Sequence, residues 1–213
     1  AWALLLAVAR RVVEGDQWVR TGQWPGWAPT QMLGADVTGK TLGVIGMGRI
    51  GQAMARRAQG FEMPVLYAAR RPLPPPLSLP GWSHRPLEDV VAEADFLSLH
   101  VPLTESTRHL IGSRELSHMK RSAILINTAR GPVVDETALL DALRSRTIAG
   151  AGLDVYEREP TLLAGLEQCP NAVLLPHLGS ATTDTRLKMG VMCLENIAAV
   201  LAGRPPLNPV RSS

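Results

Sequence analysis

Residues 41–51 read Thr-Leu-Gly-Val-Ile-Gly-Met-Gly-Arg-Ile-Gly, a pattern that predicts a strand, a glycine-rich turn and the start of a helix. An apolar run leads into three glycines, Gly46, Gly48 and Gly51, whose spacing is GxGxxG. Such a turn is tight, lets the backbone approach a pyrophosphate, and lets the following helix pack closely on the strand. Three glycines alone can simply form a turn, but a second strand is predicted from Val65, which completes a βαβ unit. We therefore predict a dinucleotide site in which the pyrophosphate is held by Gly46, Gly48, Arg49, Ile50 and Gly51 at the helix start.

Short β runs alternate with helical segments on both sides of this turn. Strands are predicted at residues 41–46, 65–69, 96–100, 123–128, 149–155 and 173–176, and helices at residues 49–60, 87–94, 113–118, 135–145 and 182–202. Apolar, β-branched strands that alternate with helices imply a parallel sheet covered on both faces. The predicted fold class is α/β, a doubly wound parallel sheet of the Rossmann type.

The end of the second predicted strand indicates which dinucleotide is bound. NAD sites usually place Asp or Glu there, and the carboxylate binds the ribose hydroxyls. Here Ala68 and Ala69 occupy those positions, and Arg70 and Arg71 follow. A guanidinium can pair bidentately with a 2′-phosphate, whereas an acid would repel it. We therefore predict NADP as the cofactor, with NADPH preferred over NADH; the alternative is that both arginines are ordinary solvated surface residues.

The residues before Lys40 lie outside the alternating pattern. Residues 1–20 are predicted to form one amphipathic helix with an apolar stripe of Leu4, Leu5, Val8, Val12 and Val19. Residues 21–39 are rich in Gly, Pro and Trp and are predicted to form a long ordered loop, a kind of segment that is often functional. Farther on, five prolines between positions 72 and 80 predict a stiff surface connection.

Composition and charge exclude several classes of protein. Of the 213 residues, 46% are hydrophobic and 19% are charged, as is typical of a globular α/β protein. The net charge is only +3 and no run of Lys and Arg could follow a phosphate backbone, so no nucleic-acid partner is expected. No apolar run approaches the roughly 18 residues that span a bilayer, so no membrane association is expected. Cys169 and Cys193 fit no metal-binding spacing, so we predict two reduced core thiols, no metal and a cytoplasmic location.

Three further segments each follow or end a predicted strand. Residues 126–131 read Ile-Asn-Thr-Ala-Arg-Gly, residues 152–160 read Gly-Leu-Asp-Val-Tyr-Glu-Arg-Glu-Pro, and residues 175–180 read Leu-Pro-His-Leu-Gly-Ser. Because the carboxyl ends of the strands line the ligand crevice of a doubly wound sheet, an Arg, a Glu and a His could converge beside the cofactor. Taken singly, Arg130 could be a salt-bridge partner, Glu159 a surface acid and His177 a capping residue.

Together with Gly46–Gly51 and with residues 100–104, His-Val-Pro-Leu-Thr, these segments resemble the D-isomer-specific 2-hydroxyacid dehydrogenases. Within that family they look most like the glyoxylate/hydroxypyruvate reductase branch, and the resemblance runs from Ala1 to Pro209. It implies an oxidoreductase that transfers a hydride between NADPH and a small 2-keto or 2-hydroxy acid, with glyoxylate or hydroxypyruvate as the expected substrate.

The resemblance also implies roles for individual residues. His177 would be the general acid and base, Glu159 would orient and tune His177, and Arg130 would bind the substrate carboxylate. Asp154 matches the family residue that binds the nicotinamide carboxamide. The His100, His84, His109 and His118 side chains are given no catalytic role. The rest of the cofactor site is expected to include Val101, Pro102, Thr107, Thr128, Ala129, Arg130, His177 and Gly179.

The resemblance divides the chain into two parts. Residues 1–182 are expected to form the dinucleotide-binding domain, with an N-terminal helix that crosses between domains and a dimerisation arm. Residues 183–213 are expected to form a helix and tail that return toward a substrate domain. We interpret Ala1 as a truncation or processing point within a helix, so the N-terminal part of that substrate domain is expected to be absent, the chain incomplete for turnover, and any targeting signal not visible.

Trp18, Trp24 and Trp27 stand within ten residues, amid Gly and Pro. The resemblance implies a symmetric homodimer in which Trp27 reaches the substrate site of the neighbouring subunit; the alternative is that the tryptophans pack on their own domain. Two other functions compete with the reductase. One is a nucleotide-binding corepressor-like module, which usually goes with NAD(H) and is therefore disfavoured by Arg70 and Arg71, and the other is a dimerisation fragment without turnover.

Overall fold

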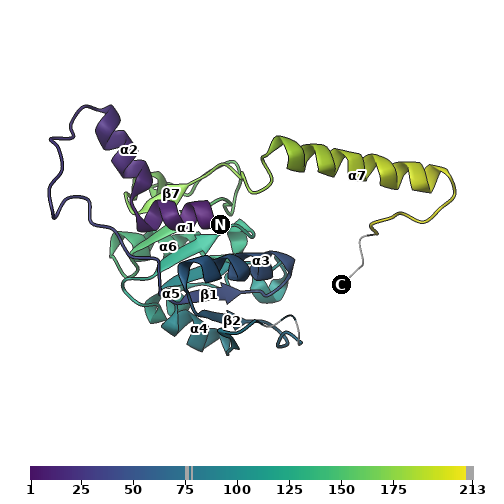
Figure 1. The fold of residues 1–213 in the computed structure, drawn as a ribbon, viewed down its shortest axis with the longest axis horizontal. Helices are drawn as coiled ribbons and strands as arrows, with labels where there is room; N and C mark the ends of the chain where they lie inside the picture. Colours follow the sequence, from purple (N-terminus) through teal and green to yellow (C-terminus); the bar gives the residue numbers. More distant parts are fainter. Residues whose placement is uncertain (75–76, 78, 210–213) are drawn as a thin grey trace. The chain divides into compact units, whose positions relative to one another are not determined.

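The computed structural model describes residues 1–74, 77 and 79–209. The chain divides into two compact units, Ala1–Pro176 and His177–Ser213 (Figure 1). The positions of these units relative to one another are not determined. The division falls after Pro176, whereas the predicted boundary followed residue 182, and the roles assigned to the two parts remain predictions.

The first unit is built around a sheet of parallel strands, seven of them among the described residues. The strand order is β3-β2-β1-β4-β5-β6-β7, so the winding reverses between β1 and β4. This confirms the predicted α/β class with a doubly wound parallel sheet. The strands are β1 (Leu42–Ile45), β2 (Val65–Ala68), β3 (Trp82–His84), β4 (Phe96–Leu99), β5 (Ile124–Asn127), β6 (Gly150–Leu153) and β7 (Ala172–Leu174).

Strand β3 is the one described strand that the sequence pattern did not predict. Its three residues pair with β2 at the edge of the sheet, and three residues are too few to show an alternating pattern. It follows the proline-rich segment, in which Pro75, Pro76 and Ser78 lie outside the described residues. The stiff connection expected there therefore remains a prediction.

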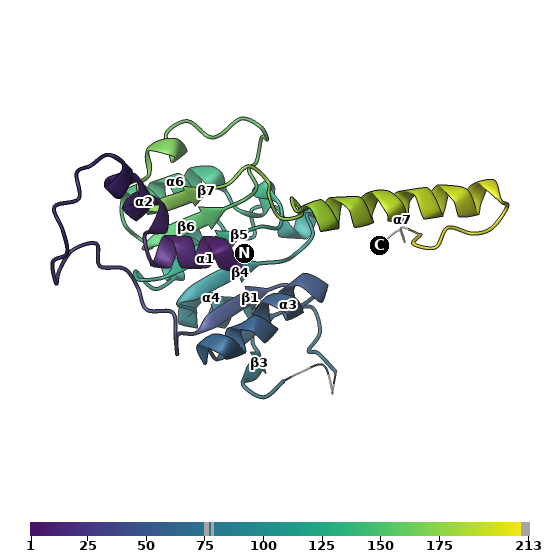
Figure 2. The ribbon, with the colours of Figure 1, turned by 45° about the horizontal axis from the view of Figure 1, so that its top comes forward.

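Helices cover both faces of the sheet (Figure 2). On one face, α1 (Trp2–Ala9) and α3 (Arg49–Ala58) pack against side chains such as Val44 and Ile126. The opposite face is covered by α4 (Leu87–Glu93), α5 (Ser113–His118) and α6 (Glu136–Arg144).

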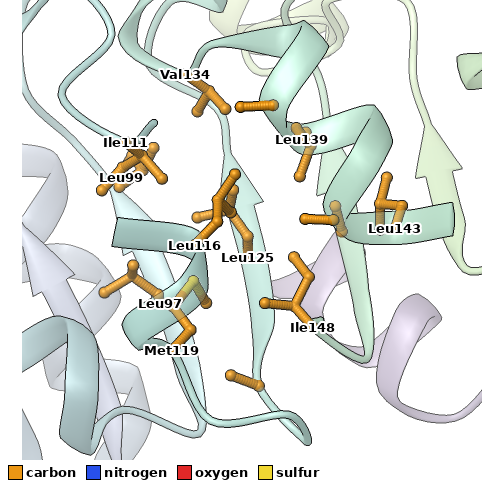
Figure 3. Packing of buried hydrophobic residues seen from close by; sticks show 14 of the residues in the cluster. Leu97, Leu99, Ile111, Leu116, Met119, Leu125, Val134, Leu139, Leu143 and Ile148 are labelled. Carbon is orange, nitrogen blue, oxygen red and sulfur yellow. The ribbon is translucent and has the colours of Figure 1, made fainter. Parts of the chain in front are cut away.

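Figure 3 shows the core of the second face, where Leu125 of β5 lies among Leu116 of α5 and Leu139 and Leu143 of α6. These four leucines are at most 1% exposed. Fully burying one such side chain contributes about 1.5–3 kcal/mol to folding, so this layer stabilises the packing of α5 and α6 on the sheet.

The prediction of one helix over residues 1–20 is wrong, because the helix is broken. The break separates α1 from α2 (Val12–Arg20) at Arg11, whose φ of 52° is left-handed. The predicted apolar stripe divides with it, since Leu4 and Leu5 are buried whereas Val12 and Val19 are exposed. The helix α2 and the loop that follows it project from the body of the unit as an arm, as both views of the ribbon show (Figures 1 and 2). The chain returns to the body before β1, where the N–H of Ala35 donates to the Ala9 carbonyl at 2.8 Å and Val37 is buried.

The second unit consists mainly of α7 (Thr183–Leu201). Thr182 caps this helix, since its side chain accepts the N–H of Thr185. Apolar side chains along α7, among them Leu187, Leu194 and Leu201, are exposed within the unit. Cys193 on this helix is exposed, so the prediction of two core thiols holds only for Cys169, which is buried. Within the described residues, no helix combines the length and the apolar character that crossing a bilayer requires.

Two short 3₁₀ turns complete the first unit outside the site loops. They are η1 (Gln59–Phe61) and η4 (Leu166–Gln168).

Candidate functional site

The glycine turn after β1 has the shape of a phosphate loop. Gly46 has a left-handed φ of 93°, and a Cβ there would lie 2.7 Å from the backbone of His100. A Cβ on Gly51 would overlap the carbonyl oxygen of Gly46, so α3 can start this close to the strand only with glycine at both positions. By contrast, a Cβ on Gly48 would meet no atom within 4 Å, and Gly48 directly precedes α3. The open side of the loop thus presents the first N–H groups of α3, at Arg49 and Ile50, as an anion site needs.

Arg70 and Arg71 lie beside this loop, at the carboxyl end of β2. The N–H of Gly46 donates to the carbonyl oxygen of Ala68 at 2.9 Å, which joins the loop to the last residue of β2. Both arginines are exposed, and among the residues that the structure describes neither takes part in an ion pair. Their charge is therefore available at the place where a ribose would lie next to the pyrophosphate.

The segment after β4 borders the loop from the other side. A Cβ on Gly46 would also lie 2.8 Å from Val101, so the two segments touch at the point where the winding of the sheet reverses. Pro102 is tied to η2 (Glu105–Thr107), because the Thr107 hydroxyl donates to the Pro102 carbonyl at 2.6 Å and accepts the N–H of Thr104 at 2.8 Å. Thr107 thus shapes this loop by its own hydrogen bonds.

A half-buried histidine, His100, lies at the start of that segment. His100 is hydrogen-bonded through Nε2 to Ser98 Oγ at 2.9 Å, and burial lowers the pKa of His100 to about 4. The ring is therefore neutral near pH 7, and it fits a structural role beside the loop better than proton transfer.

The turn after β5 carries Arg130 and is braced by Asn127. The Asn127 side chain is buried; its amide donates to the Arg130 carbonyl at 3.0 Å and its oxygen accepts the N–H of Ala129 at 3.0 Å. Thr128 and Ala129 are half-buried between them. The Arg130 side chain is exposed, with one guanidinium nitrogen donating to the Ala129 carbonyl at 2.7 Å. The 3₁₀ turn η3 (Gly131–Val133) follows directly.

The loop after β6 carries Asp154 and Glu159. Asp154 is 4% exposed and its N–H donates to the Asn127 carbonyl at 3.0 Å, which places it against the Arg130 turn. Glu159 is exposed, and its Oε1 accepts the N–H of Tyr156 at 3.1 Å. The Tyr156 hydroxyl donates to the Leu175 carbonyl at 2.9 Å, and burial raises the pKa of Tyr156 to about 12. Tyr156 therefore serves as a neutral anchor for the loop.

The structure brings most of the predicted site residues to one edge of the sheet, at the carboxyl ends of β1, β2, β4, β5 and β6. His177 and Gly179 belong to the second unit, so the structure does not place them in one site with Arg130 and Glu159. His177 has a left-handed φ of 56° and comes soon after β7. Trp27 lies on the arm and is 82% exposed, and Trp24 is 51% exposed.

Comparison with known proteins decides the family. Residues 2–179 match the family described as "D-isomer specific 2-hydroxyacid dehydrogenase, NAD binding domain". The chain belongs to this family. Its NAD-binding domain accounts for the phosphate loop and for the reversal of the sheet between β1 and β4.

Relatives within the D-2-hydroxyacid dehydrogenase family match nearly the whole chain. A glyoxylate reductase of Thermococcus litoralis is 50% identical over 214 residues, which are 99% of this chain and 65% of the relative. A solved structure from Thermus thermophilus is 53% identical with a TM-score of 0.92, and the match covers 99% of this chain and 66% of that one. The NADPH-dependent glyoxylate/hydroxypyruvate reductase of Sinorhizobium meliloti, solved with NADP and malonate, is 38% identical with a TM-score of 0.90 over 99% of this chain and 67% of that one.

The chain thus spans about 65% of the length of the Thermococcus litoralis relative. The part that it matches is the C-terminal part of the longer relatives.

One group of side chains at this edge of the dehydrogenase domain was missed by sequence reasoning. Glu136, Glu157 and His109 lie next to the Arg130 turn and the Glu159 loop, where Glu157 pairs with His109 at 3.0 Å. His109 was expected to have no role, and the two glutamates were not singled out. No short motif joins these residues, because the bonds between the two glutamates span 21 positions of the chain.

Proposed function

We propose that this chain is the cofactor-binding part of a reductase that uses NADPH to reduce small 2-keto acids, with glyoxylate or hydroxypyruvate as substrate. The observation that carries the proposal is that the phosphate loop, the Arg130 turn and the Glu159 loop follow β1, β5 and β6 and lie at the same edge of the sheet. The names of the relatives support the substrate class, since the Thermococcus litoralis relative is a glyoxylate reductase.

The cofactor proposal rests on the fit between the loops and NADPH. The loop between Gly46 and Gly51 would hold the pyrophosphate, with Arg49 and Ile50 offering N–H groups at the start of α3. Arg70 and Arg71 would pair with the 2′-phosphate, because no carboxylate stands at the end of β2 to repel it. Val101, Pro102, Thr128 and Ala129 would line the nicotinamide side, and the buried Asp154 would bind the carboxamide.

The nicotinamide, when bound, would supply the hydride that reduces C2 of the keto acid. Arg130 would pair with the substrate carboxylate and polarise the carbonyl that is reduced. His177 would donate a proton to the carbonyl oxygen, and Glu159 would accept a hydrogen bond from His177 and favour its protonated form. Hydride and proton together convert the keto acid to the hydroxy acid.

The exposed surfaces fit a larger assembly. The apolar side chains of α7 would pack on a substrate domain, which agrees with a relative of which this chain spans only 65% of the length. The arm would form a symmetric homodimer and bring Trp27 to the substrate site of the neighbouring subunit, because an exposed Trp is suited to an interface.

Two measurements test the reductase proposal. Calorimetry on the 213-residue chain is expected to show NADPH binding that is tighter than NADH binding. The complete protein, meaning this chain with any segment that precedes Ala1 in its gene, is expected to oxidise NADPH when glyoxylate or hydroxypyruvate is added. If the chain binds neither NADPH nor NADH, the proposal that it is a cofactor-binding part is wrong. If it binds a cofactor but the complete protein reduces no 2-keto acid, the proposed activity is wrong.

The assembly is tested by light scattering on the 213-residue chain at tens of micromolar. We expect a dimer, and we expect joint replacement of Trp24 and Trp27 by Ser to shift it toward monomer, because the exposed rings would supply much of the interface. Finding the unmutated chain monomeric would contradict the homodimer.

A further inference from the structure

Three titratable side chains from distant parts of the first unit meet beside the Arg130 turn. The Oε1 atom of Glu157 lies 3.0 Å from His109 Nε2 and accepts the N–H of Glu136 at 3.1 Å. In return, Oε1 of Glu136 accepts the N–H of Glu157 at 2.8 Å. Each glutamate therefore binds the backbone of the other, and we call Glu136, Glu157 and His109 the glutamate clasp.

The clasp joins the N-terminus of α6 to the loop after β6. The first N–H groups of a helix have no partner inside it, and a carboxylate near them is stabilised by the helix dipole. Asp135 already caps α6, since its side chain accepts the N–H groups of Thr137 and Ala138 at 3.0 and 3.1 Å. Glu157 takes the remaining N–H, that of Glu136, from a loop on another part of the chain.

Next to the clasp, the Arg130 turn packs directly on the Glu159 loop through Gly131. A Cβ on Gly131 would overlap the backbone of Tyr156 and would lie within 2.4 Å of the nitrogen of Glu157, so only glycine permits this approach. The N–H of Tyr156 is also the donor to Glu159 Oε1, at 3.1 Å. Two successive N–H groups thus bind the two parts: that of Tyr156 donates to Glu159, and that of Glu157 donates to Glu136 of the clasp.

His109 extends the clasp to the segment after β4. Its N–H donates to the Pro132 carbonyl at 2.8 Å, and the N–H of Ile111 donates to the Val133 carbonyl at 3.1 Å. The loops that follow β4, β5 and β6 are therefore tied to one another by the three side chains and by these backbone bonds.

Folding alone gives little reason for this arrangement. Glu136 is 6% exposed, and burial together with the nearby charges of Glu157 and Glu159 raises the pKa of Glu136, while the Glu157 N–H and the charge of Arg158 lower it. Burying a carboxylate beside two others is costly, and apolar residues often replace buried charges without loss of stability. Since Asp135 already caps the helix, what the clasp adds is the fixed relation between the loops.

We propose that Glu157, held by Glu136 and His109, is a positioning residue that fixes the Glu159 loop against the Arg130 turn. The proposal rests on the proposed reductase function, because Glu159 and Arg130 act together only in that reaction. It assigns the clasp no contact with substrate or cofactor. The clasp sets the geometry in which one loop holds the substrate and the other tunes the acid.

The first test needs no turnover and uses backbone amide exchange of Tyr156 in the 213-residue chain, followed by NMR. Glu157→Ala is expected to speed this exchange by about tenfold or more, because the loop that supplies the acceptor Glu159 is no longer held. Asp135→Ala is the matched control, since it removes the cap of α6 but no contact with the loop, and it is expected to leave the exchange of Tyr156 unchanged. If Glu157→Ala does not fold, Glu136→Ala, which removes the acceptor of the Glu157 N–H, carries the same expectation.

The second test measures NADPH-dependent reduction of glyoxylate by the complete protein. Glu157→Ala is expected to lower kcat by about 10- to 100-fold with KM for NADPH unchanged, as misplacement of a reacting group does. Glu157→Gln keeps an acceptor for the Glu136 N–H and is expected to restore most of kcat, whereas Asp135→Ala is expected to leave kcat unchanged.

The outcomes separate this proposal from the reductase proposal. Unchanged exchange of Tyr156 in Glu157→Ala, or an equal change in Asp135→Ala, overturns the positioning role whatever the activity. Unchanged kcat in Glu157→Ala overturns it as well. Faster exchange in Glu157→Ala alone, combined with a wild-type protein that reduces no 2-keto acid, supports the clasp as the link between the loops and refutes only the reductase function.

Discussion

The phosphate loop and the pair of loops that carry Arg130 and Glu159 lie at the same edge of the sheet but are held in different ways. The phosphate loop is shaped by its own backbone, since a Cβ on Gly46 or Gly51 would collide with neighbouring main chain. The other two loops also meet at a glycine, Gly131, but they are held in addition by side chains that bind backbone groups, among them Asn127, Glu136 and Glu157.

The difference follows from what each region has to place. A pyrophosphate is the same in every dinucleotide and can be bound by backbone N–H groups, so a tight glycine turn suffices. In the proposed reductase, the two other loops would have to hold a guanidinium and a carboxylate at a fixed separation, which needs contacts between the loops. Changes in the phosphate loop should therefore reduce stability and cofactor affinity, whereas changes around the Arg130 turn and the Glu159 loop should reduce turnover.

The largest effect is expected for His177→Ala in the complete protein. We expect kcat to fall by about 10²- to 10⁴-fold, the usual contribution of a general acid. The dissociation constant for NADPH, measured by calorimetry, should change little, because the ring is assigned to proton transfer. A loss of NADPH affinity as large as the loss of kcat would show that His177 acts mainly by binding the cofactor and would contradict its assignment to proton transfer.

Paired substitutions at Gly46 and Gly48 test whether the phosphate loop is shaped by its backbone. Gly46→Ala is expected to lower the free energy of unfolding by about 2–4 kcal/mol, because the new methyl group combines a positive φ with a clash against His100. Gly48→Ala meets open space and should cost less than about 1 kcal/mol in stability.

Gly48→Ala should nevertheless weaken NADPH binding, since the open space is where the pyrophosphate would lie. Urea unfolding and calorimetric titration measure the two quantities separately. Equal losses of stability in the two variants would contradict the backbone explanation.

The phosphate loop and the loops after β5 and β6 could be predicted from the sequence, because each consists of consecutive residues that directly follow an apolar strand. Strand β3 could not be predicted, because three residues are too few to show an alternating pattern. The break at Arg11 could not be predicted either, because the apolar pattern of a helix continues through it. The glutamate clasp was missed as well. Hydrogen bonds between Glu136 and Glu157 depend on how β5, β6 and α6 pack, and no local spacing encodes that packing.

Arg70→Ala is expected to have a moderate effect confined to one cofactor. The affinity for NADPH should fall by about 1–3 kcal/mol, the scale of a charge-assisted hydrogen bond, while the affinity for NADH stays unchanged. Arg56→Ala is the matched control, because Arg56 is an exposed arginine on α3 away from the end of β2. Equal losses for both cofactors in calorimetry would show that Arg70 does not bind the 2′-phosphate.

The smallest effect is expected for Glu136→Gln, and it concerns stability against pH. Burial raises the pKa of Glu136 above its ordinary value of 4.5, so the folded protein binds this proton more tightly than the unfolded chain does. The associated stability is complete below pH 4.5 and is lost as the pH rises through the raised pKa. Gln cannot ionise, so the free energy of unfolding of Glu136→Gln relative to wild type should increase from pH 4 toward pH 8 in urea titrations.

The control for this last prediction is Asp141→Asn, since Asp141 is an exposed carboxylate on the same helix and should show no such trend. If the difference in free energy of unfolding between Glu136→Gln and wild type stays constant or decreases with pH, ionisation of Glu136 does not destabilise the folded protein. In that case the two glutamates would join the Arg130 and Glu159 loops through their hydrogen bonds to backbone N–H groups, and the charge of Glu136 would add nothing to this link.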